Sequence, residues 1–220
     1  MFVKKLDMQD SFRLKGLRKK LVDELRSQGI EGSVLQAIET IPRHWFMDAD
    51  FENLAYRNTA FRIDADQTIS HPYTVAFMTS LLDVQPGEKI LEIGTGSGYQ
   101  ACVLAYLGAK VYTIERQNVL YEKTTTLLKK IGFTAVRTLY GDGFAGAPRF
   151  APFDKIIVTA GAPELPARLF AQLKVGGKMV IPIGNEAQKM FTISKVDDKT
   201  YQKQEHGEFQ FVPFLKGVTL

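Results

Sequence analysis

The stretch that decides the fold is Leu91-Glu92-Ile93-Gly94-Thr95-Gly96-Ser97-Gly98-Tyr99. An apolar run ends in a loop with a glycine at every second position, and a helical pattern follows it to Leu107. Glycine lets the main chain turn tightly and lets a ligand approach it, because no Cβ stands in the way. In α/β proteins such a loop lies at the carboxyl edge of a parallel sheet, where ligands bind. The stretch therefore predicts a strand, a ligand-binding loop and a helix.

Strand and helix patterns alternate downstream of this loop. The predicted strands are 89–94, 110–114, 135–139, 154–159 and 177–183, and the predicted helices are 98–107, 117–131 and 165–173. This rhythm predicts an α/β fold with a mostly parallel, doubly wound sheet. The patterns at 190–196 and 209–215 predict a C-terminal antiparallel edge, whose strand order the sequence leaves open.

The chain upstream of the sheet is helical and aromatic. Residues 11–29 and 33–40 have helical periodicity, and residues 43–70 carry aromatic side chains that suit packing on a core. A length of 220 residues suits one domain. We expect a single domain made of three sections: an N-terminal helical and substrate-side section (1–87), a cofactor-binding core (88–185) and C-terminal edge strands (186–220).

Composition and charge narrow the functional classes. Lys plus Arg number 28 and Asp plus Glu number 24, and no basic run is dense enough to form a nucleic-acid surface. No apolar run is long enough to span a membrane, and charged residues stand where a signal sequence would be apolar. Cys102 suits a buried thiol, and His44, His71 and His206 lack metal-ligand spacing. We expect a cytoplasmic monomer that binds no metal, nucleic acid or membrane.

Three carboxylates should meet at the loop, because Glu92 precedes it, Glu115 ends the next strand and Asp142 follows the third. Gly96-Ser97-Gly98-Tyr99-Gln100-Ala101 also fits a loose dinucleotide motif with Glu115 as its ribose-binding acid, so an NAD-type oxidoreductase stays open. The additional acids would repel a pyrophosphate and attract the cationic S-adenosylmethionine. We expect Glu115 to accept from the ribose hydroxyls, Asp142 from the adenine amino group, and the loop to hold the methionine part.

The segment before the central helical run is the second candidate site. It reads Asp66-Gln67-Thr68-Ile69-Ser70-His71-Pro72-Tyr73, and the helical run follows from Val75 to Leu82. Pro72 suits the first turn of a helix, and Ser70 or His71 suits its N-cap. The same helix end would present N–H donors and a positive dipole to a carboxylate. Ser70 is therefore a candidate for both capping and substrate binding.

These motifs resemble those of the protein-L-isoaspartate O-methyltransferase family over nearly the whole chain. They are Gln67 to Tyr73, Leu91 to Gln100, Gly141-Asp142-Gly143, Phe153 to Pro163 and Phe211-Val212-Pro213-Phe214. The resemblance implies a Rossmann-like, S-adenosylmethionine-dependent methyltransferase fold. It further implies methyl transfer to the free α-carboxylate of L-isoaspartyl residues in damaged proteins and peptides, after which the ester collapses to a succinimide.

The resemblance also marks Ser70 as the catalytic position. The candidate cofactor-binding residues are Thr68, Glu92, Gly94, Thr95, Gly96, Gly98, Glu115, Asp142 and Gly143. The chain departs from the family at Ile63-Asp64-Ala65-Asp66, where glycines are usual, and the two acids put the substrate range in question. Methylation of another carboxylate, and cofactor binding without catalysis, stay open as alternatives.

Overall fold

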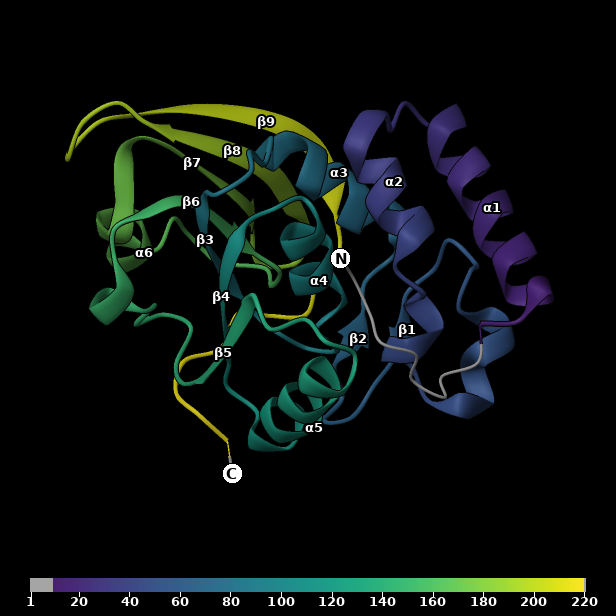
Figure 1. The fold of residues 1–220 in the computed structure, drawn as a ribbon. Helices are drawn as coiled ribbons and strands as arrows, with labels where there is room; N and C mark the ends of the chain where they lie inside the picture. The colour runs from purple at the N-terminus through teal and green to yellow at the C-terminus, as the bar shows by residue number, and fades with distance from the viewer. Residues whose placement is uncertain (1–9, 220) are drawn as a thin grey trace.

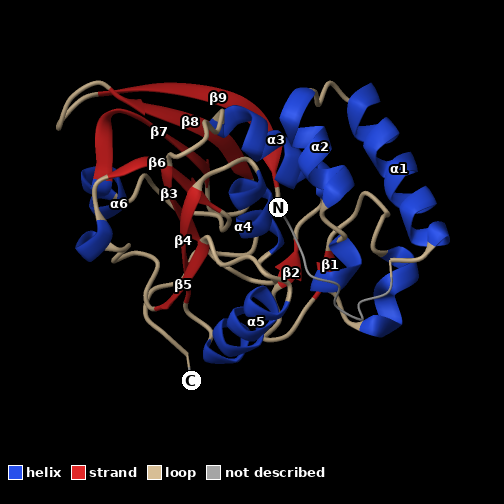
Figure 2. Ribbon diagram, in the orientation of Figure 1, coloured by secondary structure: helices blue, strands red, loops and turns tan. Residues whose placement is uncertain are grey.

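The computed structural model describes residues 10–219, which form a central sheet flanked by helices (Figure 1, Figure 2). The helices are α1 Phe12–Ser27, α2 Gly32–Thr40, α3 Pro72–Leu82, α4 Tyr99–Tyr106, α5 Asn118–Lys130 and α6 Ala167–Gln172, with 3-10 helices η1 Arg43–Phe46, η2 Ala49–Leu54 and η3 Pro148–Phe150. The strands are β1 Phe61–Arg62, β2 Thr68–Ile69, β3 Lys89–Ile93, β4 Lys110–Glu115, β5 Val136–Tyr140, β6 Phe153–Val158, β7 Leu173–Ile183, β8 Gln188–Lys195 and β9 Tyr201–Phe209. Within residues 10–219, no helix has the length and apolar character needed to cross a membrane.

Seven strands of the described chain form the central sheet, in the order β5-β4-β3-β6-β7-β8-β9. The first five in this order pair in parallel, and β8 and β9 continue the sheet antiparallel from β7. The chain moves outward from β3 to β5 on one side and from β6 to β9 on the other, so the direction reverses between β3 and β6. Ligands bind to such sheets at the carboxyl ends beside this reversal. The predicted doubly wound sheet with an antiparallel edge is confirmed.

Side chains alternate between the two faces of each strand, which gives the sheet two apolar layers. On one face Ile90 packs in a cluster with residues of α3 and α4. On the opposite face Leu91 packs in a cluster with Leu169 of α6. By this alternation Glu92 shares the face of Ile90, and it interacts electrostatically with Cys102 of α4. Glu92 is therefore enclosed within the sheet-helix layer.

The N-terminal helices pack as a pair beside α3 (Figure 1). Their shared apolar core includes Leu21 of α1 and reaches Ala76 of α3. Arg18 is buried here and donates to the Asp10 carboxylate at 2.8 Å and to the Tyr56 hydroxyl at 3.0 Å. This core fixes α3, and with it the segment that precedes α3, against the sheet.

The last strand differs from the sequence prediction. It is β9, Tyr201–Phe209, and the prediction of a strand at 209–215 is wrong. β9 lies at the sheet edge with mostly exposed side chains, so it lacks the apolar alternation of a half-buried strand. Pro213 has no N–H to donate to a strand ladder, which disfavours a strand at 209–215.

Residues 210–219, here called the C-terminal segment, run across the carboxyl ends of the sheet. The N–H of Gly161, after β6, donates to the Val212 carbonyl at 2.8 Å, and the N–H of Phe214 donates to the Gly161 carbonyl at 2.9 Å. Further on, the N–H of Thr219 donates to the Arg116 carbonyl, after β4, at 2.8 Å. The segment therefore spans the sheet edge where ligands are expected.

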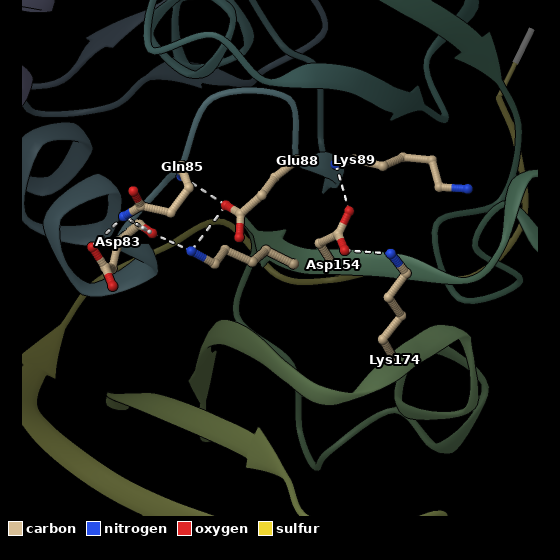
Figure 3. Close-up of polar contacts among 7 residues, drawn as sticks. Asp83, Gln85, Glu88, Lys89, Asp154 and Lys174 are labelled. Carbon is tan, nitrogen blue, oxygen red and sulfur yellow. Dashed lines mark hydrogen bonds and ion pairs between the residues drawn. The ribbon is translucent and has the colours of Figure 1, made fainter.

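A cluster of charged side chains lies at the amino ends of β3 and β6 (Figure 3). The Lys155 ammonium lies 2.9 Å from the Glu88 carboxylate and also donates to the Asp83 carbonyl. Asp154 pairs with Lys174. The Lys155 side chain is 9% exposed and that of Lys174 is 45% exposed. The pair between the buried Lys155 and the partly exposed Glu88 therefore fastens the loop after α3 to the sheet, at the edge opposite the ligand-binding one.

Removing the buried lysine is expected to destabilise the fold far more than removing the exposed one. Lys155→Met should lower the free energy of unfolding by about 2 kcal/mol, because it removes the ion pair with the partly exposed Glu88 carboxylate and the hydrogen bond to the Asp83 carbonyl. Lys174→Met should cost less than about 1 kcal/mol, since an exposed pair contributes little. Urea unfolding of both variants measures the difference, and equal losses would contradict this account of the cluster.

Candidate functional site

A cleft lies at the carboxyl ends of β3 and β4, beside the reversal of chain direction. It encloses about 1130 Å³, its open mouth included. Its walls come from the segment that leads into α3, the glycine loop, the ends of β4 and β6, and the C-terminal segment. Seven predicted site residues line it, namely Thr68, Ser70, Gly94, Thr95, Gly96, Glu115 and Gly143. The other three, Glu92, Gly98 and Asp142, lie behind or beside this lining.

The glycine loop turns its main-chain N–H groups into the protein. The N–H groups of Gly94 and Thr95 both donate to the Ile114 carbonyl, at 2.9 and 3.2 Å. The N–H of Gly96 donates to the Glu115 carboxylate at 2.9 Å. A pyrophosphate-binding loop needs such N–H groups directed at the ligand. The geometry of this loop therefore disfavours a dinucleotide.

Two glycines of the loop have different physical roles. Gly96 has φ +51, and a Cβ added there would meet only Ile63 Cδ1 at 3.8 Å. Gly98 has φ +84, and a Cβ there would lie 2.7 Å from Thr124 Cγ2 of α5. Gly98 thus permits close packing of the loop on α5, whereas Gly96 is favoured by its positive φ and not by crowding.

Glu115 organises the loop and still has acceptor capacity. It ends β4 and is 4% exposed. Its Oε2 accepts from the Gly96 N–H, and its Oε1 accepts from the Gln117 N–H, each at 2.9 Å. An ionised carboxylate has about four lone-pair sites, so each oxygen can accept one more donor. A vicinal diol such as that of ribose supplies two donors at the required spacing.

Glu92 does not share the rim with Glu115, in contrast to the sequence expectation. It is fully buried, and neither carboxylate oxygen has a hydrogen-bond partner within residues 10–219. Burial raises the pKa of Glu92 to about 8, Glu115 adds to the rise, and the Thr113 hydroxyl counters part of it. Neighbouring side chains of a strand point to opposite faces of the sheet, and Ile93 is the one that lines the cleft. Glu92 therefore points to the other face, away from this lining.

Asp142 and Gly143 form a tight turn after β5. Asp142 Oδ1 accepts from the Phe144 N–H at 2.9 Å, which leaves Oδ2 as an available acceptor within the described chain. A Cβ on Gly143 would lie 2.6 Å from Ile93 Cγ2 and 2.8 Å from Phe214 Cε2. The Phe144 and Phe214 rings stack with centroids 3.9 Å apart. This turn is therefore packed between the sheet and the C-terminal segment.

Ser70 is not the cap of α3. The N-cap residue is His71, and the Tyr73 N–H in the first turn donates to Asn58 Oδ1 at 2.9 Å. Ser70 lines the cleft, and its hydroxyl makes no hydrogen bond to any part of the chain that the structure describes. Thr68 lines the cleft from β2. Ser70 therefore does not serve as the helix cap, and of its two expected roles the binding of a ligand in the cleft is the one that stays.

The acidic lead-in to Ser70 is a two-residue hairpin turn. The Gln67 N–H donates to the Asp64 carbonyl at 3.2 Å, and Ala65 and Asp66 have φ 57 and 53. These are the angles of a type I′ turn, which usually contains Asn-Gly. The Asp64 carboxylate lies 2.7 Å from the Lys123 ammonium of α5. Asp64 is therefore paired with a cation, and Lys123 ties the hairpin to α5.

Two contributors to the cleft escaped the sequence analysis. One is the wall formed by residues 210–215 of the C-terminal segment, for which Pro213 inside a predicted strand was the available signal. The other is Arg43, whose guanidinium donates to the Ser70 carbonyl at 3.0 Å. No local pattern marks Arg43, because the carbonyls to which it donates lie 12 to 27 residues further along the chain.

Comparison with known proteins places the chain in a family. The family model for Protein-L-isoaspartate(D-aspartate) O-methyltransferase (PCMT) matches residues 16–219. A protein-L-isoaspartate O-methyltransferase of Flavobacterium psychrophilum is 54% identical over 210 residues, which cover 95% of this chain and 99% of that protein. One of Salinibacter ruber is 44% identical over 218 residues and covers 94% of each chain.

Two solved structures have the same fold as this chain. A protein-L-isoaspartate O-methyltransferase structure has a TM-score of 0.82 at 28% identity and covers 89% of this chain and 65% of that chain. A putative protein-L-isoaspartate O-methyltransferase from Plasmodium falciparum, solved in complex with S-adenosyl-L-homocysteine, has the same fold, with a TM-score of 0.80 at 24% identity and coverage of 91% and 99%. The chain belongs to the protein-L-isoaspartate (D-aspartate) O-methyltransferase family.

Proposed function

We propose that the protein transfers a methyl group from S-adenosylmethionine to the free α-carboxylate of L-isoaspartyl residues in damaged proteins and peptides. The composition of the cleft carries this proposal. One wall presents the Glu115 carboxylate, and another presents the Ser70 hydroxyl and the N-terminal end of α3. An acidic wall suits a cationic methyl donor, and a hydroxyl at a positive helix end suits an anionic acceptor.

The residues around the glycine loop fit S-adenosylmethionine, which when bound supplies an activated methyl group on a positively charged sulfur. Glu115 accepts from the ribose hydroxyls with its remaining lone pairs. Asp142 accepts from the adenine amino group through Oδ2. Thr68 contacts the ligand from β2. Glu92 lies beneath the loop and, because it is largely protonated at neutral pH, it supports the strand end without adding a charge to the cofactor side. Gly94, Thr95, Gly96, Gly98 and Gly143 shape the surface that receives the ligand.

The part of the cleft at Ser70 and the N-terminal end of α3, here called the acceptor side, receives the substrate carboxylate. It has to orient this carboxylate more than it has to transfer a proton. An α-carboxylate with a pKa of about 3.5 is ionised at neutral pH, so no general base is required. The carboxylate oxygen bonds to the methyl carbon while the carbon-sulfur bond breaks and leaves its electron pair on sulfur. Ser70 donates to the second carboxylate oxygen and holds the first one in line with the methyl group. Such positioning can supply roughly 7–11 kcal/mol of a reaction barrier.

The product explains how methylation leads to repair. In the ester, the main-chain nitrogen that follows the residue attacks the ester carbonyl and expels methanol, which closes a succinimide. Water then opens the ring at either carbonyl, so part of the product is a normal aspartyl linkage. The protein itself has to supply only the ester.

Product analysis tests this proposal. An isoaspartyl peptide incubated with the protein and S-adenosylmethionine should gain one methyl group in mass, and the ester should decay to succinimide and then partly to the aspartyl peptide. The same peptide amidated at the α-carboxyl should remain unchanged. Measurable cofactor binding without any ester would instead favour the non-catalytic alternative.

Ser70→Ala is expected to lower kcat by about 10- to 100-fold, the effect of losing one hydrogen bond to a charged group. The affinity for S-adenosylmethionine should stay within about twofold, because Ser70 faces the acceptor. Single-turnover kinetics and calorimetry separate the two quantities. Ser80→Ala is the matched control, since Ser80 is exposed on α3 and, within residues 10–219, its hydroxyl bonds the Ala76 carbonyl of its own helix. An unchanged kcat in Ser70→Ala would remove Ser70 from the site.

The proposal places this reaction in the cytoplasm, with a monomer acting on peptides and not on nucleic acid. A net charge of only +4, with no dense basic run, supports the exclusion of nucleic acid. The substrates themselves follow from membership of the family.

A further inference from the structure

Arg43 is a buried cation directly behind the acceptor side of the cleft. It lies in η1 and is 0% exposed. Its Nη1 donates to the Ala55 carbonyl at 2.6 Å, and its Nη2 donates to the carbonyls of Thr59 at 3.3 Å and Ser70 at 3.0 Å. The guanidinium therefore holds together three main-chain segments, one of which carries the Ser70 side chain into the cleft.

No carboxylate compensates the charge of Arg43 among residues 10–219. Its hydrogen bonds go to neutral carbonyls, its Nη1 also contacts Met47 Sδ at 3.5 Å, and its Nε has no partner. Burial lowers the pKa of Arg43 to about 10, so the group stays protonated at neutral pH. The buried Arg18 in the same chain differs, because it is paired with Asp10 at 2.8 Å.

The residues around Arg43 are apolar or aromatic, so the electrostatic potential of its charge reaches the cleft. The guanidinium lies over the Phe61 ring, 5.8 Å from its centroid, and close to Tyr99, which is fully buried and lines the cleft. The Tyr99 hydroxyl also has no hydrogen-bond partner within the described residues. An apolar environment of this kind screens a charge weakly, so its potential extends to the nearby Ser70 side chain.

We propose that Arg43 is a positioning residue that makes the acceptor side of the cleft selective for an anion, by fixing the Ser70 main chain and by leaving an uncompensated positive charge behind it. The inference rests on the proposed function, in which the acceptor is a carboxylate. A single buried charge at this position raises the ratio of the affinity for an anion to the affinity for its neutral analogue by about tenfold.

This role predicts an unusual kinetic pattern. Methyl transfer neutralises the carboxylate, so a positive charge behind Ser70 stabilises the bound substrate more than the transition state. Met47→Glu cancels the charge and leaves the hydrogen bond from Arg43 to the Ser70 carbonyl in place, so it should raise KM for the isoaspartyl peptide by about tenfold without lowering kcat. A residue that only maintained the structure would lower kcat, because the Ser70 hydroxyl would lose its position.

The experiment measures the affinity ratio of two isoaspartyl peptides, one with a free α-carboxylate and one with an α-carboxamide, in the presence of S-adenosylhomocysteine. Arg43→Gln removes the charge and keeps a hydrogen-bond donor, and Arg43→Lys keeps the charge. Met47→Glu leaves Arg43 in place and adds a carboxylate beside its Nη1, so it decides the question even where Arg43→Gln fails to fold. Met47→Gln controls for shape, and Arg13→Met on the exposed face of α1 controls for net charge.

We expect Arg43→Gln and Met47→Glu to reduce the acid-to-amide ratio by about tenfold while the affinity for the amide stays within about twofold. Arg43→Lys, Met47→Gln and Arg13→Met should keep the ratio of the wild type. An unchanged ratio in Met47→Glu, or an equal loss of acid and amide binding in Arg43→Gln, would overturn the proposal for Arg43. A wild-type protein that fails to methylate the acid peptide would instead overturn the proposed function.

Discussion

Glu92→Gln is expected to raise the free energy of unfolding by about 3 kcal/mol at pH 7, because the wild type buries an acid whose pKa is raised to about 8. Folding favours the protonated form of this group. Its contribution to stability is therefore fully present below the unfolded pKa of about 4.5 and is lost progressively as the pH rises toward 8. Glutamine keeps the shape of the protonated acid and has no proton to lose.

Urea unfolding at a series of pH values between about 4 and 9 measures this effect. The wild type should lose stability across the interval, and Glu92→Gln should lose less. Glu122→Gln is the matched control, because Glu122 is exposed on α5 and, within the described residues, accepts from Asn118 of the same helix. Parallel curves for the wild type and Glu92→Gln would mean that Glu92 is solvated or paired in the folded protein.

Glu115→Ala is expected to weaken S-adenosylmethionine binding by more than about 100-fold. The variant loses acceptors for two ribose hydroxyls, each of which contributes about 1.5–3 kcal/mol as a hydrogen bond to a charged group. It also releases the N–H groups of Gly96 and Gln117, which Glu115 holds at 2.9 Å each. Calorimetry measures the affinity, and Glu122→Ala is expected to bind as the wild type does.

A double-mutant cycle separates the ribose contact from the effect on the loop. S-adenosylhomocysteine should bind the wild type about tenfold more tightly than its 2′-deoxy analogue does. Glu115→Ala should not discriminate between the two ligands, because the acceptor is absent. If the variant retains the full preference for the hydroxyl, Glu115 acts only through the glycine loop.

The sheet and the glycine loop could be predicted because their signals are local. Buried parallel strands read as apolar runs, and the 91–99 stretch carries its turn in its own glycines. The same local logic places Glu115 beside the cleft, since Glu115 ends the strand that follows the loop. Ser70 is predicted from the helix start that follows it and from the family resemblance. The family resemblance then added the reaction, which periodicity alone does not contain.

The remaining parts depend on contacts between distant segments. The hairpin turn at Ala65 and Asp66 has positive φ at both residues but no glycine, and Lys123 of α5 ties it in place. The strand β9 is too polar to be recognised from an apolar pattern, because it lies at the edge. Arg43 bonds to three carbonyls, which carry no side-chain signature. Such features follow from packing and become visible only in the folded chain.

The most direct test of isoaspartyl methylation uses labelled S-adenosylmethionine and two peptides that differ only in an aspartyl or an isoaspartyl linkage. Isoaspartyl methylation predicts base-labile methyl label on the isoaspartyl peptide and none above background on the aspartyl one. Equal labelling of both peptides, or no labelling despite cofactor binding, would contradict it.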